Sequence, residues 1–509
     1  MRPPSEQAES RSNKGIVILV LAIVCFIAAR THADPDLWGH VRFGQDILAS
    51  GLPTADPYSY LTGDQIWINH EILPEILFGA AFTGLGVPGL VALKVGLILA
   101  TVGLLYWRLL RYGLHPLRAG LVVITALMLL SVGLWTIRPQ LFTYLFFLLT
   151  LLLIDAAERG HKRAVWALPA VMLVWANSHG GFLAGLGVVA IWAGVHVLLL
   201  LRSSARKTGP FQGVVTVGVL PATCIAATLL NPYGVNLISF LLRTATVARP
   251  EIGEWQPISI GSPEGAVYLV AVGVSIVALF GSTRPRRPAL LAVLFVTALL
   301  PMQALRHLPL FALSFAVLVG EHLSDVWNRW SPSTGTSQWK LPPAAGFVSA
   351  AVFLGAAVPY FSCVRIDPSF ISFPARATAL MKAADIRGNV ATFFDWGEYL
   401  IWHLGPGVRV SIDGRRETVY SPVVYNRSLQ FLYGVGEWDA ILEDPRTDMA
   451  LVGRDQPTYN LMRLKPGWIL VYEDSLSALF TRPDSPQALA IRNAVPGSLP
   501  PDGNDLCFP

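Results

Sequence analysis

The chain has 509 residues, of which 53% are hydrophobic and only 14% are charged, and its formal net charge is +5. Soluble domains carry about 25% charged residues, so the composition excludes an ordinary soluble protein and indicates an integral membrane protein with one soluble part. The basic residues lie in short loops between apolar segments, which argues against nucleic acid as a partner. The sequence has no P-loop and no G-x-G-x-x-G in a strand–helix context, so no nucleotide cofactor is implied.

Apolar segments follow one another along most of the chain. A helix needs about 17 to 25 apolar residues to cross a bilayer, and we predict about eleven transmembrane helices. They are residues 15–30, 88–110, 118–137, 139–157, 164–176, 182–202, 213–230, 265–282, 288–304, 308–324 and 343–361. The first segment lacks a clear cleavage site and is predicted to be an anchor. Residues 72–84 are apolar but short, so we expect a helix at the membrane interface.

Loop charges predict the orientation of these helices, because cytoplasmic loops carry an excess of Lys and Arg. With eleven spans, the basic loops all fall on one side. They contain Arg108, Arg111 and Arg118; Arg159, Lys162 and Arg163; Arg202, Arg206 and Lys207; Arg284, Arg286 and Arg287; Arg329 and Lys340. We therefore predict a multi-pass protein of a bacterial inner (plasma) membrane with a cytoplasmic N-terminus. The loop 31–87 and everything after residue 361 would be extracytoplasmic.

The first outer loop begins with the acidic sequence "HADPDLWGH" (32–40). The stretch "PDLWGHVRFGQDILASG" predicts an amphipathic helix that starts near Pro35 and ends before Gly51. Asp34 could be its N-cap, and Asp36 would lie in its first turn, where the helix dipole favours a carboxylate. A carboxylate at the polar mouth of a helix bundle is also well placed to act as a base.

Further polar residues reach the same predicted membrane face from distant segments. They are His40, His70 and Glu71 in the first loop, and Arg138, Asn177, His179, Glu254, Arg306 and His307 between later spans. Ionisable groups at membrane depth are costly and usually mark a site or a water-filled cavity. A single arginine could instead extend its head group to the lipid surface. For the whole set we predict a polar cavity that opens outward.

The C-terminal part, residues 362–509, alternates strand and helix patterns and predicts a small α/β domain with a mainly parallel sheet. Expected strands are 388–394, 408–414 and 449–453, followed by a hairpin of "WILVYED" and "SALFTR"; expected helices are 395–404, capped by Asp395, and 456–464. The tail 484–509 is expected to be irregular. We interpret Glu398, Asp413 and Arg415 as surface charges, with a sugar-binding face as the alternative. Cys363 and Cys507 bracket this part and could form a disulfide.

A span followed at once by "DPD", a long first outer loop with "WINHEILPE", a many-span bundle and a C-terminal outer domain resemble the GT-C superfamily of membrane glycosyltransferases. This family includes protein O-mannosyltransferases and the aminoarabinose transferase. The resemblance implies a GT-C-like transmembrane domain over residues 1–361, including the loop 31–87, and an extracytoplasmic domain over 362–509. It also implies a polyprenyl-phosphate or polyprenyl-diphosphate sugar as donor, an envelope lipid, glycan or protein as acceptor, and inversion at the anomeric carbon.

The family's chemistry implies roles for individual residues. Asp36, or else Asp34, would be the general base, and Arg138, Arg306 and His307 would neutralise the lipid phosphate. His70 and Glu71 could orient the acceptor or, with Asp36, hold a divalent metal, although no tight metal-ligand spacing is present; no other cofactor is expected.

Other functions remain open at this point. The chain could be a transporter or flippase, a non-catalytic protein of envelope assembly, or a polymerase or ligase of envelope polysaccharide. Transporters tend to show internal repeats and charges near the midplane of the bilayer. This sequence shows no repeat, and its charges cluster at one face, which favours an enzyme.

Overall fold

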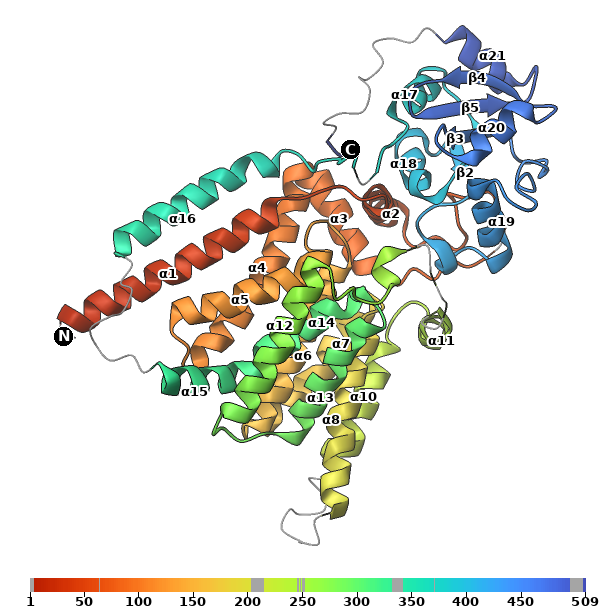
Figure 1. Ribbon diagram of the computed structural model, residues 1–509. Helices are drawn as coiled ribbons and strands as arrows, with labels where there is room; N and C mark the ends of the chain where they lie inside the picture. Colours follow the sequence, from red (N-terminus) through yellow and green to blue (C-terminus); the bar gives the residue numbers. More distant parts are fainter. Residues whose placement is uncertain are drawn as a thin grey trace. The chain divides into compact units, whose positions relative to one another are not determined.

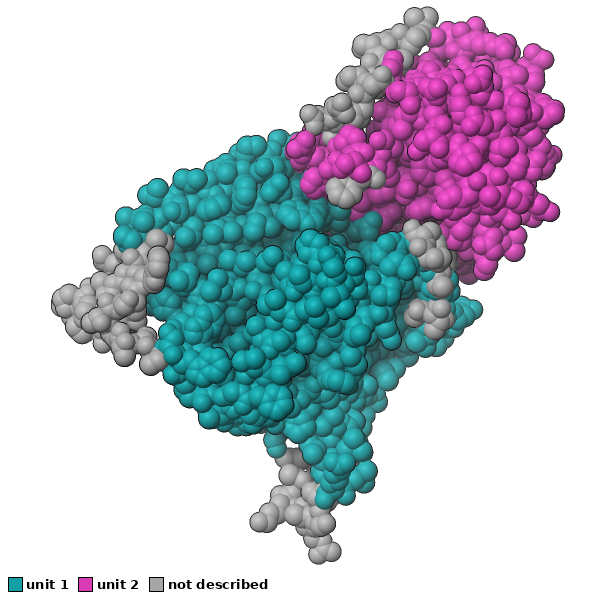
Figure 2. Space-filling model, in the orientation of Figure 1, with its two compact units in different colours: residues 1–31, 91–362 teal, residues 32–90, 363–509 magenta. Residues whose placement is uncertain are grey.

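The computed structural model describes residues 4–63, 65–202, 215–244, 247, 249, 252–331, 342–369, 371–494 and 507–509. Arg206, Lys207 and Lys340, which entered the orientation argument, lie outside these residues. The chain divides into two compact units (Figure 2): unit 1 is residues 1–31 and 91–362, and unit 2 is residues 32–90 and 363–509. The first outer loop, grouped with the transmembrane part in the sequence analysis, thus falls in the same unit as the C-terminal part.

Unit 1 is helical throughout its described residues. Its main helices are α1 (Pro4–Ala29), α4 (Val87–Arg111, which begins in unit 2), α5 (Pro116–Leu130), α6 (Gln140–Glu158), α7 (Leu168–Ala176), α8 (Phe182–Arg202), α10 (Leu220–Thr228), α11 (Val235–Thr244), α12 (Pro263–Gly281), α13 (Pro288–Leu299), α14 (Leu308–Ser314), α15 (Gly320–Trp330) and α16 (Pro343–Ala357). Seven helical segments of the described chain are long and apolar enough to cross a membrane. The protein is a multi-pass membrane protein.

Each of the eleven predicted spans contains a helix. In four of the predicted spans, the apolar helical stretch is shorter than in the seven long segments; these spans are 15–30, where the stretch is Asn13–Ala29 of α1, and 164–176, 213–230 and 288–304. Helices α1 and α16 run side by side (Figure 1), and Phe26 packs edge-on against Phe353 and Tyr360. The amphipathic helix α11 was not predicted, because its ten residues are too few for a span.

Charged side chains from three of the predicted basic loops meet in unit 1. Arg159 donates to Asp155 at 3.0 Å and to Glu321 at 2.6 Å, and Arg287 donates to Glu321 at 3.0 Å. Arg108 also pairs with Asp155, which is only 1% exposed. Loops far apart in the sequence therefore lie at one end of the bundle, as the charge pattern predicts.

Unit 2 combines the two helices of the first loop, α2 (Asp36–Ser50) and α3 (Ile72–Leu85), with a five-stranded sheet of order β2-β1-β3-β5-β4. Its strands are β1 (Gly388–Ala391), β2 (Val408–Val410), β3 (Met449–Gly453), β4 (Ile469–Glu473) and β5 (Ser477–Thr481); its other helices are α17 (Ala375–Ala383), α18 (Phe394–Leu404), α19 (Pro422–Tyr433), α20 (Pro457–Leu464) and α21 (Pro486–Asn493). The predicted α/β class, the strand positions and the closing hairpin are confirmed.

Three details differ from the sequence prediction. The sheet is mixed, because β1 pairs with β2 and β3 in parallel whereas β5 pairs with β3 and β4 antiparallel. Asp395 lies in the first turn of α18, and the cap position belongs to Phe393. Helix α21 lies within the tail that was expected to be irregular.

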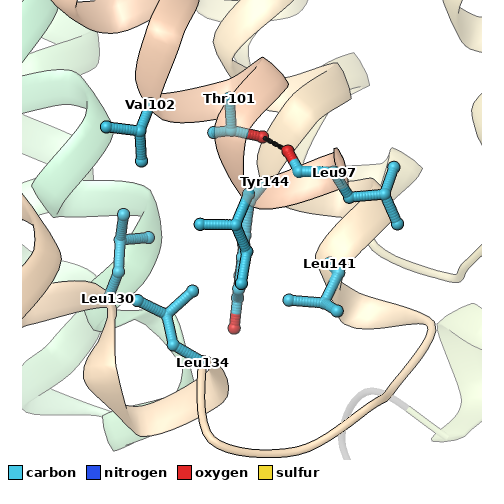
Figure 3. A pocket seen from close by; sticks show the side chains of 8 residues that line it. Leu97, Thr101, Val102, Leu130, Leu134, Leu141 and Tyr144 are labelled. Carbon is cyan, nitrogen blue, oxygen red and sulfur yellow. Dashed lines mark hydrogen bonds between the residues drawn. The ribbon is translucent and has the colours of Figure 1, made fainter. Parts of the chain in front are cut away.

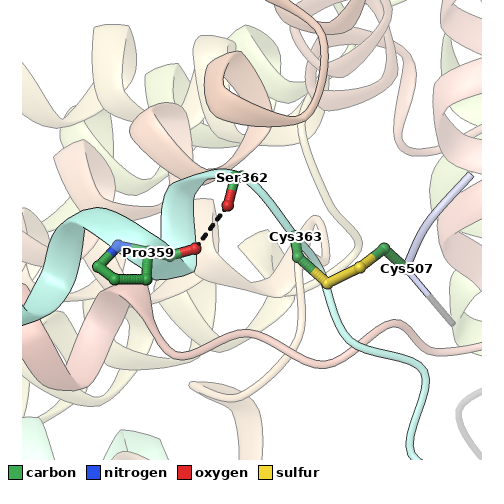
Figure 4. The surroundings of a disulfide bond; sticks show 4 residues. All are labelled: Pro359, Ser362, Cys363 and Cys507. Atoms are coloured by element: carbon green, nitrogen blue, oxygen red, sulfur yellow. Dashed lines mark hydrogen bonds between the residues drawn. A yellow bond between two sulfur atoms is a disulfide. The ribbon is translucent and has the colours of Figure 1, made fainter. Parts of the chain in front are cut away.

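A disulfide joins Cys363 to Cys507 (Figure 4), which closes a loop with a sequence separation of 144. The sequence analysis left this bridge open. It ties the last described residues of the chain to the segment that leads into the C-terminal part, so both ends of that part are fixed together.

Candidate functional site

Helix α2 positions the first candidate catalytic residue. The helix begins at Asp36, with Pro35 in the cap position, and the main-chain oxygen of Asp34 accepts a hydrogen bond from the Leu37 N–H at 3.2 Å. Asp34 is therefore not the N-cap residue, and Asp36 lies in the first turn as predicted. The predicted apolar side of the helix is buried, and Gly51 ends it with a φ of 79°.

A buried cluster of His40, Glu71 and Glu75 forms between α2 and α3. His40 Nδ1 lies 3.4 Å from Glu75 Oε1 and 4.0 Å from Glu71 Oε2. The helices can approach this closely because Gly44 and Gly79 face each other, and a Cβ on Gly44 would clash with the main chain of α3. Burial alone would lower the pKa of His40, but the hydrogen bond to Glu75 and the charges of Glu71, Glu75 and Asp36 raise it to about 9.

These three side chains could hold a divalent metal. One ligand atom from each of His40, Glu71 and Glu75 lies within 4.8 Å of the others. An imidazole nitrogen with two carboxylate oxygens suits transition metals such as zinc or manganese better than calcium. The sequence analysis suggested Asp36, His70 and Glu71 instead; His70 Nε2 lies 3.7 Å from Glu71 Oε1. Glu75 was missed, although its i,i+4 spacing from Glu71 predicts a shared helix face.

A second set of buried charges in unit 2 surrounds Arg415. Its guanidinium donates to both oxygens of Asp56 at 2.7 and 3.2 Å, and to both oxygens of Asp413 at 2.9 and 2.6 Å. The rings of Phe43, Tyr58 and Trp67 lie around it, with centroids 4.7 to 5.1 Å from its central carbon. The interpretation of Asp413 and Arg415 as surface charges is wrong, because both are buried. They join the first loop to the C-terminal part.

Glu398 on α18 is the third buried charged residue that the sequence analysis took for a surface charge. It is 3% exposed, and its Oε2 accepts a hydrogen bond from the Gly39 N–H at 3.0 Å. Gly39 lies one turn after Asp36 on α2. A residue of the C-terminal part therefore contacts the helix that carries the predicted base.

In unit 1, Arg138 and Arg306 converge on Glu254. The guanidinium of Arg138 lies 4.0 Å from the Glu254 carboxylate, and that of Arg306 lies 3.7 Å from it. Arg306 and Arg249 both lie over the Trp255 ring, at 4.2 and 3.9 Å from its centroid. Two arginines thus lie near the Glu254 carboxylate, and a third shares the Trp255 ring with Arg306. A cluster with more cationic than anionic groups is suited to an anion.

The other predicted residues of unit 1 have different surroundings. Both main-chain and side-chain groups reach the ring of His179: Thr143 Oγ1 lies 2.9 Å from its Nδ1, and the Gly181 N–H donates to the same nitrogen at 2.9 Å. Asn177 donates to the main-chain oxygens of Leu173 and Leu230. Both residues thus stabilise the turn between α7 and α8. His307 follows Arg306, and its Nδ1 lies 3.4 Å from the Leu300 oxygen.

A small apolar cavity lies among α4, α5 and α6, lined by leucines, Val102 and the ring of Tyr144 (Figure 3). Its volume is about 10 Å³, which is no more than about one water molecule occupies. As it stands, this cavity cannot accept a lipid chain.

No protein-family model and no curated protein matches the chain. Solved structures do match its fold. The apo oligosaccharyltransferase of Archaeoglobus fulgidus aligns over 86% of this chain and 69% of its own, with 13% identity and a TM-score of 0.55. ArnT from Cupriavidus metallidurans bound to undecaprenyl phosphate aligns over 91% and 97%, with 14% identity and a TM-score of 0.52.

The protein has a GT-C fold. The suspicion raised by the acidic pair after the first span is thus confirmed at the level of the fold. The alignment with ArnT covers nearly the whole length of both chains.

Proposed function

We propose that this GT-C protein transfers a sugar from a polyprenyl-phosphate carrier to an acceptor of the cell envelope. The observation that carries the proposal is the convergence of Arg138 and Arg306 on Glu254, in a fold shared with a protein bound to undecaprenyl phosphate. A related structure holds an acceptor peptide, that of the A. fulgidus oligosaccharyltransferase.

In this proposal the arginine cluster binds the phosphate of the carrier. Arg138 and Arg306 donate charge-assisted hydrogen bonds to the phosphate oxygens, which stabilises the negative charge that develops as the sugar–phosphate bond breaks. Glu254 holds both guanidiniums in place before the lipid enters. Trp255 keeps Arg306 and Arg249 oriented through contacts with its ring.

Asp36 acts as the general base. Its carboxylate takes the proton from the acceptor hydroxyl or amide while the acceptor atom attacks the anomeric carbon. The bond from that carbon to the phosphate oxygen breaks, and the phosphate leaves with the electron pair. A single displacement of this kind inverts the anomeric configuration. The first turn of a helix is a favourable place for the required negative charge.

A divalent cation is the cofactor that unit 2 could accommodate, held by His40, Glu71 and Glu75. Bound there, the cation would supply positive charge as a Lewis acid. The three residues themselves would fix α2 against α3 and so hold Asp36 in one orientation.

We also propose that unit 2 is extracytoplasmic and that the membrane is the bacterial inner membrane. Disulfides persist in oxidising compartments, so the Cys363–Cys507 bridge supports this location. The cluster of basic loop residues with Asp155 and Glu321 would then lie on the cytoplasmic side.

The test is a comparison of cell envelopes by mass spectrometry. A strain lacking the gene should lose one envelope glycan or sugar modification, and the wild-type gene should restore it whereas Asp36→Asn should not. Restoration by Asp36→Asn would favour the alternative of a non-catalytic assembly protein. Retention of the donor's anomeric configuration in the product would contradict the single displacement.

A further inference from the structure

Glu398 brings a second carboxyl group to Asp36. The residue lies on α18 in the C-terminal part, 362 positions after Asp36, and is 3% exposed. Asp36 is more exposed, at the start of α2. The carboxyl groups of Asp36 and Glu398 both lie beside Gly414. A Cβ added to Gly414 would lie closer than 3.0 Å to Asp36 Oδ1 and also to Glu398 Oε1. The two oxygens are therefore near neighbours.

The other oxygen of Glu398 is used to hold α2. The first N–H groups of a helix lack partners inside the helix, and a side chain at the cap position usually accepts from one of them. Pro35 occupies that position and makes no such bond. Glu398 Oε2 instead accepts a hydrogen bond from the N–H of Gly39, the fourth residue of α2, at 3.0 Å. The first turn of the helix that carries Asp36 is thus held by a residue far along the sequence.

Two glycines make room for the carboxyl group of Glu398. A Cβ on Gly39 would collide with both of its oxygens, and one on Gly414 would collide with Oε1. Any larger residue at either position would displace Glu398 from α2. Gly39 in "LWGHV" and Gly414 in "SIDGR" therefore both leave space for the carboxyl group of Glu398, although they lie far apart in the sequence.

The charges around this pair decide which carboxyl group is ionised. Burial first, and then the negative charges of Asp36 and Asp413, raise the pKa of Glu398 well above its ordinary value; Arg415 opposes this, and Glu75 of α3 adds to it. Arg415 makes its hydrogen bonds to Asp56 and Asp413. Asp36 is the more exposed of the two acids.

We infer that Glu398 is a positioning residue for Asp36: it holds the first turn of α2 through Oε2 and, as the protonated member of the pair, leaves the single negative charge on Asp36. This inference rests on the proposed function, in which Asp36 is the base. It gives the C-terminal part a direct role in the reaction, because that part sets the orientation and the ionisation of the base.

Infrared spectroscopy of the purified full-length protein tests the inference without any transfer reaction. The difference spectrum between wild type and Glu398→Gln at neutral pH should contain the carbonyl stretch of a protonated carboxylic acid. In Asp36→Asn the pH at which this band disappears should fall by about one unit or more, because a neighbouring like charge has been removed. Asp46→Asn, also on α2, should leave it unchanged. Absence of the band, or an unchanged midpoint in Asp36→Asn, would overturn the inference.

If Glu398→Gln does not fold, the difference spectrum cannot be recorded. The protein is then labelled with ¹³C in the carboxyl groups of its glutamates, and the shifted carbonyl band is followed directly. The labelled band must then titrate at lower pH in Asp36→Asn than in wild type, and an unchanged midpoint again overturns the inference.

Transfer activity provides the second readout. Glu398→Ala should lower transfer at least about tenfold, and Glu398→Gln should recover most of that loss, because its amide oxygen accepts the Gly39 hydrogen bond without adding charge. Wild type should lose activity at high pH as Glu398 ionises, and Glu398→Gln should not. Full transfer by Asp36→Asn would contradict the proposed function. It would leave the inference about Glu398 standing, because the infrared result does not depend on transfer.

Discussion

The guanidinium of Arg415 holds the carboxylate of Asp56 through two parallel hydrogen bonds of 2.7 and 3.2 Å, although 359 positions separate the two residues. Both side chains are buried, and Asp413 accepts two further hydrogen bonds from Arg415. The first loop and the C-terminal part are thus joined by one cation between two acids. This arrangement makes the first loop an integral part of unit 2.

Arg415→Met should destabilise the protein by about 3 to 5 kcal/mol, because removing one partner leaves buried charges uncompensated. Arg409→Met, on the exposed side of β2, should change the free energy of unfolding by no more than about 0.5 kcal/mol. Thermal unfolding of the full chain in detergent measures both. Equal stability of the two variants would show that the buried ion pairs contribute little.

We expect the affinity for the carrier lipid to depend on Arg138 and Arg306. Arg138→Gln and Arg306→Gln should each weaken the binding of undecaprenyl phosphate about 10- to 100-fold, since a hydrogen bond to a charged group is worth about 1.5 to 3 kcal/mol. Binding can be measured by native mass spectrometry of protein in nanodiscs. Arg243→Gln, an exposed arginine at the end of α11, serves as the matched control. A loss of similar size in all three variants would indicate unspecific charge attraction.

The cluster of His40, Glu71 and Glu75 predicts one bound divalent metal per chain. Elemental analysis of the purified protein should find that metal, and His40→Ala and Glu75→Gln should each reduce its amount to background, because a site with two remaining ligands binds weakly. His161→Ala, an exposed histidine of unit 1, should keep it. If wild type and Glu75→Gln contain equal amounts, these residues hold no metal.

We expect the protonation of His403 to make the stability of the protein depend on pH. It lines a cavity of about 290 Å³ with Tyr399 and Lys382, and burial, followed by the charge of Lys382, lowers its pKa from 6.5 to about 4. As the pH falls, the unfolded chain takes up this proton before the folded protein does, so stability present above pH 6.5 is lost between pH 6.5 and 4.

His403→Gln should remove that loss, which amounts to about 3 kcal/mol. The difference in unfolding temperature between wild type and the variant, followed from pH 7 to pH 4, isolates the effect from other titrating groups. A difference that does not change with pH would mean that His403 titrates normally.

The sequence predicts the local features of this protein well and its long-range pairs poorly. Segment length suffices for the predicted spans of unit 1, though not for the short helix α11, and short apolar runs suffice for β3 and the closing hairpin. The mixed sheet could not be predicted, because the pairing of β3 with β5 rather than with another parallel strand is a tertiary choice. Arg138, Glu254 and Arg306 could be singled out because charges are rare in the predicted outer loops.

The burial of Glu398 and Arg415 could not be predicted from the sequence. Charged residues are common in a soluble α/β domain, so their sequence surroundings carry no sign of burial. Only the fold shows that their partners Gly39 and Asp56 come from the first loop.

The most direct test of the central claim is the transfer rate of Asp36→Asn, measured on the full-length protein with a polyprenyl-phosphate sugar and the acceptor found in the envelope comparison. Removal of a general base costs about 100- to 10,000-fold in rate, so the variant should lose at least 100-fold while it keeps its fold and binds undecaprenyl phosphate as wild type does. Asp46→Asn, on the same helix, should transfer normally. Transfer by Asp36→Asn at the wild-type rate would contradict the account.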